Sequence, residues 1–174
     1  MREFVAVDVG PEAERRPATA HLTLRFLGEV PPERNHLLGR LLAGVGRESA
    51  PFLLRLEGVG AFPTPARPRV VWVGVTRGRS EVAELARRVQ AALASDFGPS
   101  PEEFVPHLTL FRVRSVQDRV VAQELLAGAR PAPPPRDVLI DRLLLKESVL
   151  GPRGAVHRTI ADFPLEAAPP TAGR

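Results

Sequence analysis

The tetrapeptide His-Leu-Thr-Leu occurs twice, beginning at His21 and at His107, in a chain with four histidines. Alternate side chains of a β-strand share one face. His21 and Thr23 would therefore point to one side and their leucines to the other, and the same holds for His107 and Thr109. If the two strands lie near one another in a common sheet, two imidazoles and two hydroxyls line one cleft.

Such a set of side chains suits the hydrolysis of a phosphodiester. One imidazole can take a proton from water while the other, protonated, gives a proton to the leaving oxygen. Imidazole suits both tasks because its unperturbed pKa is about 6.5. The threonine hydroxyls can donate to the non-bridging phosphate oxygens, where charge builds in the transition state.

A single His-Leu-Thr-Leu is an ordinary amphipathic strand, but a second identical copy should occur by accident in on the order of one sequence in several hundred. We expect no catalytic role for His36, which falls in a predicted helix and should face the solvent. His157 begins the last predicted strand, where it could face the cleft or the solvent, and we favour a non-catalytic role. A metal site built from His21, His107 and Asp8 is conceivable, but neither an HExxH spacing nor a carboxylate cluster supports it.

The composition indicates one compact domain or two small lobes sharing a core, because the chain has 174 residues, 44% of them hydrophobic. The absence of cysteine excludes disulfides, thiolate zinc sites and a cysteine nucleophile, and is compatible with a reducing cytoplasm. The amino terminus does not resemble a signal peptide, and no segment approaches the roughly 18 to 20 apolar residues of a spanning helix. We therefore expect a soluble, cytoplasmic protein with no membrane association.

The charge balance is mildly basic, with a formal charge of +4 and a sequence pI of about 11.0. Lys146 is the only lysine, so nearly all cations are arginines, which suit bidentate contacts to phosphate. A basic balance favours polyanionic partners. A general bias of the sequence toward arginine, alanine and proline explains the composition equally well.

Periodicity and turn residues predict alternating strands and helices. The predicted strands are 3–9, 21–27, 52–58, 69–75, 107–113, 138–149 and 155–163. Three helices are predicted, the first beginning at Pro31-Pro32-Glu33, the second carrying Val82 to Leu93, and the third at 116–128. We expect loops at 60–65 and 131–135. Each His-Leu-Thr-Leu strand precedes a helix and then further strands, which indicates a duplicated, two-lobed arrangement.

The sequence resembles the 2H phosphoesterase superfamily, whose members carry two H-x-[ST]-x motifs. The resemblance is closer to its RNA 2′,3′-cyclic phosphodiesterase branch, also called the 2′-5′ RNA ligase (LigT-like) family. It extends over nearly the whole chain and rests on an ordered set of segments: Arg2–Val7, His21–Glu29, Gly60–Pro63, Pro68–Trp72, Pro106–Arg112 and Ser148–Gly154.

The resemblance implies a duplicated α+β fold at 1–165, with two antiparallel sheets lining a central cleft and helices outside. The tail at 166–174 is rich in alanine and proline, and we expect it to be flexible. The resemblance also implies a metal-independent phosphoric diester hydrolase without a cofactor, active as a monomer on RNA ending in a 2′,3′-cyclic phosphate. The product would be a 2′-phosphomonoester, and reversal would give 2′-5′ RNA ligation. His21 would be the acid and His107 the base, while Thr23, Thr109 and Arg112 would hold the phosphate.

Two departures from the family pattern concern the first lobe and the last strand. Only about a dozen residues separate Val9 from His21, too few for a helix of ordinary length with its loops. His157 stands where relatives often carry a tyrosine. Two alternative functions remain open: a cyclic phosphodiesterase acting on a small nucleotide, and a non-enzymatic module that binds RNA ends. With one Trp, no Tyr and eight Phe, the chain offers few platforms for stacking a long single strand.

Overall fold

The computed structural model describes residues 2–10, 20–100, 103–151 and 154–168, which form two four-stranded antiparallel sheets and the helices around them. Sheet A has the strand order β2-β1-β7-β8. Its strands are β1 (Arg2–Asp8), β2 (His21–Glu29), β7 (Arg142–Gly151) and β8 (Gly154–Pro164). Sheet B has the order β5-β4-β3-β6. Its strands are β3 (Phe52–Thr64), β4 (Arg67–Arg77), β5 (His107–Arg112) and β6 (Arg136–Ile140). The predicted α+β class with two antiparallel sheets is therefore confirmed.

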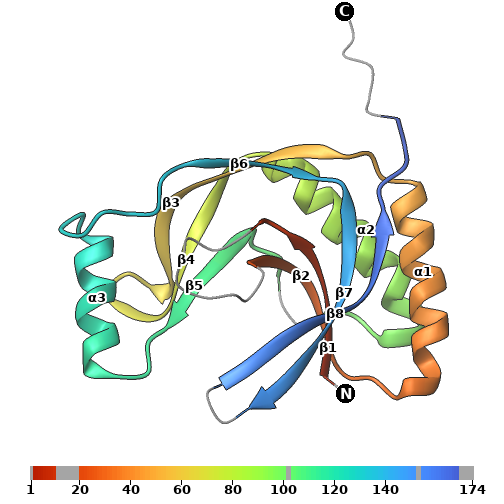
Figure 1. The fold of residues 1–174 in the computed structure, drawn as a ribbon, viewed down its shortest axis with the longest axis horizontal. Coiled ribbons are helices and arrows are strands. Elements are labelled where there is room, and N and C mark those ends of the chain that lie inside the picture. Colours follow the sequence, from red (N-terminus) through yellow and green to blue (C-terminus); the bar gives the residue numbers. More distant parts are fainter. Residues whose placement is uncertain (1, 11–19, 101–102, 152–153, 169–174) are drawn as a thin grey trace, which may run out of the picture.

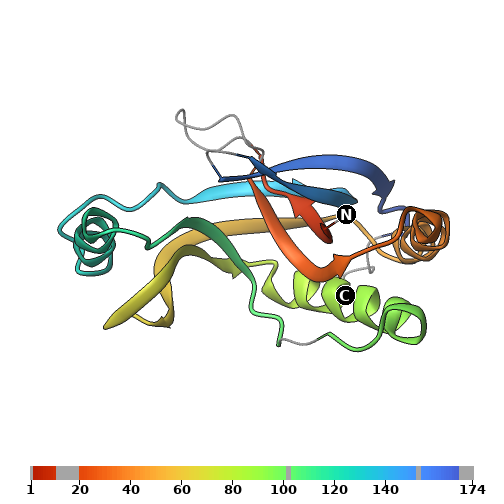
Figure 2. The ribbon, with the colours of Figure 1, turned by 90° about the horizontal axis from the view of Figure 1, so that it is seen from below.

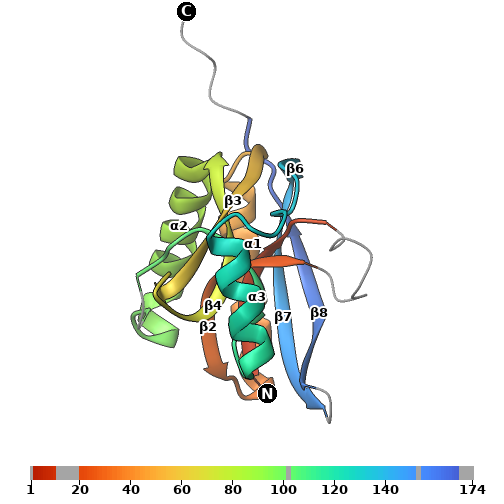
Figure 3. The same ribbon diagram turned by 90° about the vertical axis from the view of Figure 1, so that its left-hand side faces the viewer.

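The helices lie on two sides of the sheets. They are the short 3-10 helix η1 (Pro32–Arg34), α1 (Asn35–Arg47), α2 (Arg79–Phe97) and α3 (Val116–Leu126). Figure 1 shows α1 and α2 beside the sheets on one side and α3 on the other, and Figure 2 shows α1 and α3 at opposite ends of the long axis. In Figure 3, β7 and β8 lie on the opposite side of the molecule from α2. None of these helices combines the length and apolar character needed to cross a bilayer.

The core joins one face of each sheet to α1 and α2. The apolar residues of α1 repeat at helical spacing, at Leu38, Leu42 and Val45, and α2 continues the pattern with five buried residues. These side chains pack with buried residues of both sheets in one hydrophobic cluster, which includes Leu22 and Leu108 of the two His-Leu-Thr-Leu segments. Burial of both leucines fixes the opposite face of each motif strand as the face that carries the histidine and threonine.

The loop predicted at 60–65 is wrong, because β3 continues to Thr64 and forms a long hairpin with β4. Glycine and proline in this segment indicate a loop. In the structure, however, Pro63 lies opposite Pro68 at a register shift near the hairpin end, and the Phe62–Pro63 peptide is cis. The missing N–H groups of the two prolines thus fall where the ladder is already irregular.

The single strand predicted at 138–149 is also wrong, because this apolar run contains two strands in different sheets. β6 ends at Ile140 in sheet B, and β7 begins at Arg142 in sheet A. Between them, the Asp141 carbonyl accepts a hydrogen bond from the Leu165 N–H at 2.8 Å, and the Asp141 carboxylate binds the Arg142 guanidinium. Hydrophobicity alone does not reveal where a chain changes sheets.

Two segments singled out in the sequence lie wholly or partly outside the residues that the structure describes. The shortened stretch before His21 falls on residues 11–19, and the tail includes 169–174, all outside the described residues. After β8, the N–H groups of Glu166 and Ala167 donate to the carbonyls of Gly46 and Ser49. The chain therefore stays attached to the end of α1 for two residues beyond Leu165.

Candidate active site

His21 and Thr23 project from β2, the edge strand of sheet A. In the ladder with β1, His21 lies opposite Asp8 and Thr23 lies opposite Ala6. Both site residues are half-buried, whereas Leu22 is fully buried in the core. We call the face that carries His21 and Thr23 the inner face of sheet A.

His107 and Thr109 project from β5, the edge strand of sheet B, in the same manner. His107 lies opposite Gly74 and Thr109 opposite Trp72 of β4. Both are half-buried, and Leu108 between them belongs to the core. We call the face that carries His107 and Thr109 the inner face of sheet B.

The two motif strands belong to different sheets. Strand alternation alone leaves open whether two strands share a sheet. β2 is the edge of sheet A and β5 the edge of sheet B. They are nonetheless neighbours, with Cα atoms of the two strands within 8 Å of one another. The duplication places each motif at the matching edge of its own sheet, and the two edges meet.

Both motif strands contain a β-bulge at the same position, the fourth residue of the tetrapeptide. In β2, Thr23 pairs with Ala6 and Arg25 with Val5, which leaves Leu24 as the extra residue. In β5, Thr109 pairs with Trp72 and Phe111 with Val71, which leaves Leu110 as the extra residue. A bulge shifts the alternation by one, so the sixth residue of each segment returns to the inner face.

The sixth residue is not the same in the two segments. The first continues Arg-Phe and the second Phe-Arg, so the bulges bring Phe26 to the inner face of sheet A and Arg112 to that of sheet B. Without its bulge, Arg112 would point away from Thr109. Arg112 is exposed, lies opposite Val70 and completes the predicted set of five residues.

Arg25, the counterpart of Phe111, is a structural residue. It is 3% exposed, and its guanidinium donates to the carbonyl oxygens of Gln90, within α2, and of Phe97 and Gly98, at the C-terminal end of α2. Burial lowers its pKa. The bonds to Phe97 and Gly98 satisfy carbonyls that a helix end leaves without partners, and all three bonds tie the first motif strand to α2.

Aromatic rings surround His21 on the inner face of sheet A. Its ring centroid lies 4.9 Å from that of Phe4 and 5.0 Å from that of His157, and Phe4 and His157 also meet edge to face at 5.1 Å. These contacts define the orientation of the His21 ring. Our expectation that His157 has no chemical role is compatible with this placement, but His157 contacts the motif.

The imidazole of His107 has a defined tautomer. Its Nδ1 lies 2.7 Å from the carbonyl oxygen of Val105, which can only accept, so Nδ1 carries the proton. In the neutral ring the lone pair is then on Nε2, the arrangement that a general base requires. Phe62 contacts this ring edge to face at 4.9 Å.

Trp72 of β4, the strand between β3 and β5, lies beside the same histidine. Its ring centroid is 5.2 Å from that of Phe62 and 6.3 Å from that of His107. A Cβ atom on Gly60 would overlap the indole ring, so the glycine allows Trp72 to lie over the strand. The segment around Gly60 that the family resemblance included thus packs next to the second motif.

The sole lysine, Lys146, belongs to the central strand β7 of sheet A and lies opposite Phe4 of β1. Lys146 is 1% exposed, and its Nζ donates to the Thr159 hydroxyl at 3.1 Å. Burial lowers the pKa of Lys146, and the nearby Asp8 carboxylate opposes part of this shift. Burial, and secondly the charge of Lys146, lower the pKa of His157, which favours the neutral form of its ring.

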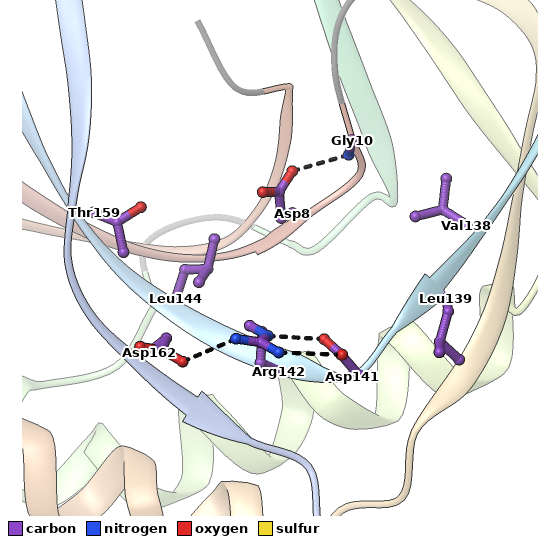
Figure 4. A pocket seen from close by; sticks show the side chains of 9 residues that line it. All are labelled: Asp8, Gly10, Val138, Leu139, Asp141, Arg142, Leu144, Thr159 and Asp162. Atoms are coloured by element: carbon purple, nitrogen blue, oxygen red, sulfur yellow. Dashed lines mark hydrogen bonds and ion pairs between the residues drawn. The ribbon is translucent and has the colours of Figure 1, made fainter.

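A pocket of about 510 Å³ lies between the two sheets, near the first motif. It is lined by residues of both sheets, with Val138 and Leu139 from β6 and Asp8, Leu144 and Thr159 from sheet A. Three aspartates line it, and Figure 4 shows Arg142 bound to two of them, Asp141 and Asp162. Asp8, the third, accepts the N–H of Gly10 at 2.9 Å. Within the described ranges, no three acidic or histidine side chains are arranged to hold a metal ion.

The sequence did not identify the rings around the two histidines. Phe4 and Asp8 lie at even-numbered positions of the first strand, so alternation places them on one face. The contact of Phe4 with His21 depends on the pairing of β1 with β2, which alternation does not reveal. Phe62 fell within a predicted loop. His36 is exposed on α1, as expected.

The comparisons with known proteins agree with this arrangement. Residues 4–149 match the family model described as the 2′-5′ RNA ligase superfamily. A relative from Aeropyrum pernix, named RNA 2′,3′-cyclic phosphodiesterase, is 37% identical over 92% of this chain and 90% of its own length.

Two solved structures share the fold over 95% of this chain and 98% of theirs. One is TT0787 of Thermus thermophilus, with a TM-score of 0.69 and 29% identity. The other is E. coli LigT complexed with 3′-AMP, with a TM-score of 0.69 and 27% identity.

Proposed function

The chain belongs to the 2′-5′ RNA ligase superfamily, and from this membership we propose that it is a phosphoric diester hydrolase acting on RNA that ends in a 2′,3′-cyclic phosphate. A relative that is 37% identical over 92% of this chain is named RNA 2′,3′-cyclic phosphodiesterase. The observation that carries the proposal is the matched placement of two His-Leu-Thr-Leu segments, each bulged at its last leucine, on adjacent edge strands.

In the proposed mechanism, His107 acts as the base. Its Nδ1 proton is engaged by the Val105 carbonyl, so Nε2 takes a proton from water. The water oxygen forms a bond to phosphorus, and the bond between phosphorus and the ribose 3′ oxygen breaks. His21, in its protonated form, gives a proton to that oxygen. The product is a 2′-phosphomonoester, and the two imidazoles end with exchanged protonation states.

The phosphate is held by Thr23, Thr109 and Arg112 in this proposal. The hydroxyls lie on the same faces as the two histidines, and the bulge at Leu110 returns the guanidinium to the face of Thr109. A planar guanidinium can donate two parallel hydrogen bonds to phosphate oxygens and oppose the charge that builds there. Both motifs lie on one chain, so we propose that a monomer carries the complete site.

Hydrolysis of a defined RNA tests this function. An oligoribonucleotide ending in a 2′,3′-cyclic phosphate is incubated with the protein in excess chelator, and the product phosphate is assigned to the 2′ or 3′ position by phosphorus NMR. We expect a 2′-phosphate at an undiminished rate. A 3′-phosphate would contradict the assigned leaving group, and activity that is lost in chelator and restored by one metal would contradict the metal-independent mechanism.

A further inference from the structure

Four exposed arginines gather at one end of sheet B, where β4 begins and β5 ends. Arg67 and Arg69 lie in the first three residues of β4, and Arg112 and Arg114 lie at and just after the end of β5. The two pairs are adjacent because the Val113 N–H donates to the Arg69 carbonyl at 2.9 Å. We call these four residues the basic end of sheet B. Arg112 belongs to the proposed phosphate site, so the other three extend that site outward.

These guanidiniums are free of carboxylate partners in the described part of the chain, unlike many other arginines. Arg87 and Arg88 share Glu84, Arg130 pairs with Glu124, and Arg55 pairs with Asp137. Asp118 is an acid close to the basic end, and its charge interacts with that of Arg114. Its carboxylate accepts the backbone N–H groups of Arg114 and Ser115 as part of the α3 cap, and these bonds lower its pKa. The basic end therefore keeps most of its positive charge.

The opposite side of the motif pair is acidic. The pocket between the sheets is lined by Asp8, Asp141 and Asp162 and by one guanidinium, that of Arg142, and the buried Lys146 lies near Asp8, so three carboxylates face two cations. Asp8 lies opposite His21 in the ladder, so this pocket borders the first motif. The charge on the inner surface thus changes sign from the pocket, past the histidines, to the basic end.

From this polarity we infer that the RNA chain upstream of the cyclic phosphate leaves the active site over the basic end of sheet B, where Arg67, Arg69 and Arg114 bind its backbone phosphates. The inference rests on the proposed function and adds a path and a direction to it. A cyclic phosphate occupies the 3′ end of an RNA, so the rest of the chain extends from the site in one direction only. Phosphodiesters would be repelled by the three aspartates and attracted by the unpaired guanidiniums.

Contacts of this kind have a measurable dependence on salt and chain length. Each phosphate neutralised on a single strand contributes about 0.7 to the slope of the logarithm of affinity against the logarithm of salt concentration. A cyclic mononucleotide has no upstream phosphodiester, so it cannot use the basic end. Substrate length therefore separates this surface from the catalytic machinery.

The experiment compares a tetranucleotide ending in a 2′,3′-cyclic phosphate with 2′,3′-cyclic AMP, for the wild type and for R67A/R69A and R114A. We expect the double variant to lower kcat/KM for the tetranucleotide by roughly tenfold at low salt and to reduce the salt slope by about 1.4. Activity on 2′,3′-cyclic AMP should be unchanged, which also shows that the variants fold. The control R40A/R47A removes two exposed arginines of α1 that likewise have no carboxylate partner in the described ranges, and it should affect neither substrate.

Two results would overturn the inference while the proposed function stands. One is equal kcat/KM for both substrates in the wild type, with no salt dependence for the tetranucleotide. The other is an equal loss in R67A/R69A and R40A/R47A, which would indicate a general charge effect. Failure of the wild type to hydrolyse either substrate would instead overturn the proposed function.

Discussion

The ring of His157 meets the ring of His21 edge-on, with their centroids 5.0 Å apart and their planes at 82°. Phe4 contacts both rings, so each of the three packs against the other two. The last strand of sheet A thereby reaches the first motif, although β1 and β7 lie between β8 and β2. Aromatic pairs at such distances and angles stabilise one relative orientation.

Replacing His157 tests whether this contact positions His21. His157→Ala removes the ring that contacts His21 edge to face. We expect kcat to fall roughly tenfold, because the His21 imidazole is then less well oriented. His157→Phe keeps a ring and should retain most of the activity. The measurement is kcat with saturating 2′,3′-cyclic AMP.

The pH dependence of His157→Phe distinguishes packing from titration. Burial and, secondly, the charge of Lys146 lower the pKa of His157, which favours the neutral form of its ring. The pH–rate profile should keep the shape of the wild type. Loss of one limb of the pH–rate profile in His157→Phe would show that the His157 imidazole itself takes part in the chemistry. Equal inactivity of His157→Phe and His157→Ala would show the same.

The sequence indicated the four motif residues because strand alternation is a local property. The duplication also indicated two equivalent halves. Register across strands is not local, so the neighbours of the histidines, Phe4 and His157 above all, could not be identified. The bulges at Leu24 and Leu110 are invisible in the alternation itself, and only the family resemblance pointed to Arg112.

The sheet assignments failed for a related reason. Residues 138–140 and 143–145 are apolar on both sides of the Asp141-Arg142 pair. Hydrophobicity records burial without recording which sheet buries a residue. The segment at Gly60 combines residues that are common in turns, yet β4 supplies a partner strand along its whole length. In both segments, tertiary pairing decided the structure against the local preference.

Arg112 should be required for chemistry and unimportant for stability. Arg112→Ala is expected to lower kcat/KM for 2′,3′-cyclic AMP by roughly 10- to 100-fold, because a charge-assisted contact to the phosphate is lost. Arg112→Lys should recover only part of this loss, since an ammonium cannot donate in the planar, bidentate geometry.

Arg25 provides the matched control from the first segment. Arg25→Ala leaves the carbonyls of Gln90, Phe97 and Gly98 without their donor, so it should lower the unfolding free energy by about 1 to 3 kcal/mol. Thermal unfolding of both variants separates the two roles. An Arg112→Ala variant that loses stability but not activity would contradict the assignment.

The pH–rate profile of the wild type should be bell-shaped. One imidazole must be neutral to accept a proton and the other must be protonated to donate one, so activity falls on both sides of an optimum. The measurement is kcat/KM for 2′,3′-cyclic AMP between pH 4 and pH 9, a range chosen to span the ordinary pKa of about 6.5. A profile with only one limb would contradict a mechanism with two titrating histidines.

Glu3 should destabilise the fold at neutral pH. It is 2% exposed, and burial raises its pKa above the ordinary 4.5, with the Asn35 side chain offsetting part of the shift. The folded state therefore holds the proton more tightly than the unfolded state, and the unfolding free energy decreases as the pH rises above 4.5. Glu3→Gln should raise the Tm at pH 7 and weaken this pH dependence.

Glu147, the ladder partner of Glu3, supplies the comparison. Its buried carboxylate is bound by the guanidinium of Arg158, so Glu147→Gln removes an ion pair and should not raise the Tm. Thermal unfolding at pH 4 and pH 7 checks both variants. A Glu3→Gln variant with a lower Tm at pH 7 would show that the ionised carboxylate is stabilising.

The two-histidine mechanism is tested most directly by single-turnover hydrolysis of RNA ending in a 2′,3′-cyclic phosphate by His21→Ala and His107→Ala. Each variant should remain folded in thermal unfolding, because both imidazoles are half-buried on the inner faces and neither belongs to the hydrophobic core. Each should lose at least roughly 10²- to 10⁴-fold in rate, the usual contribution of a general acid or base. Hydrolysis at the wild-type rate by either variant would contradict the mechanism.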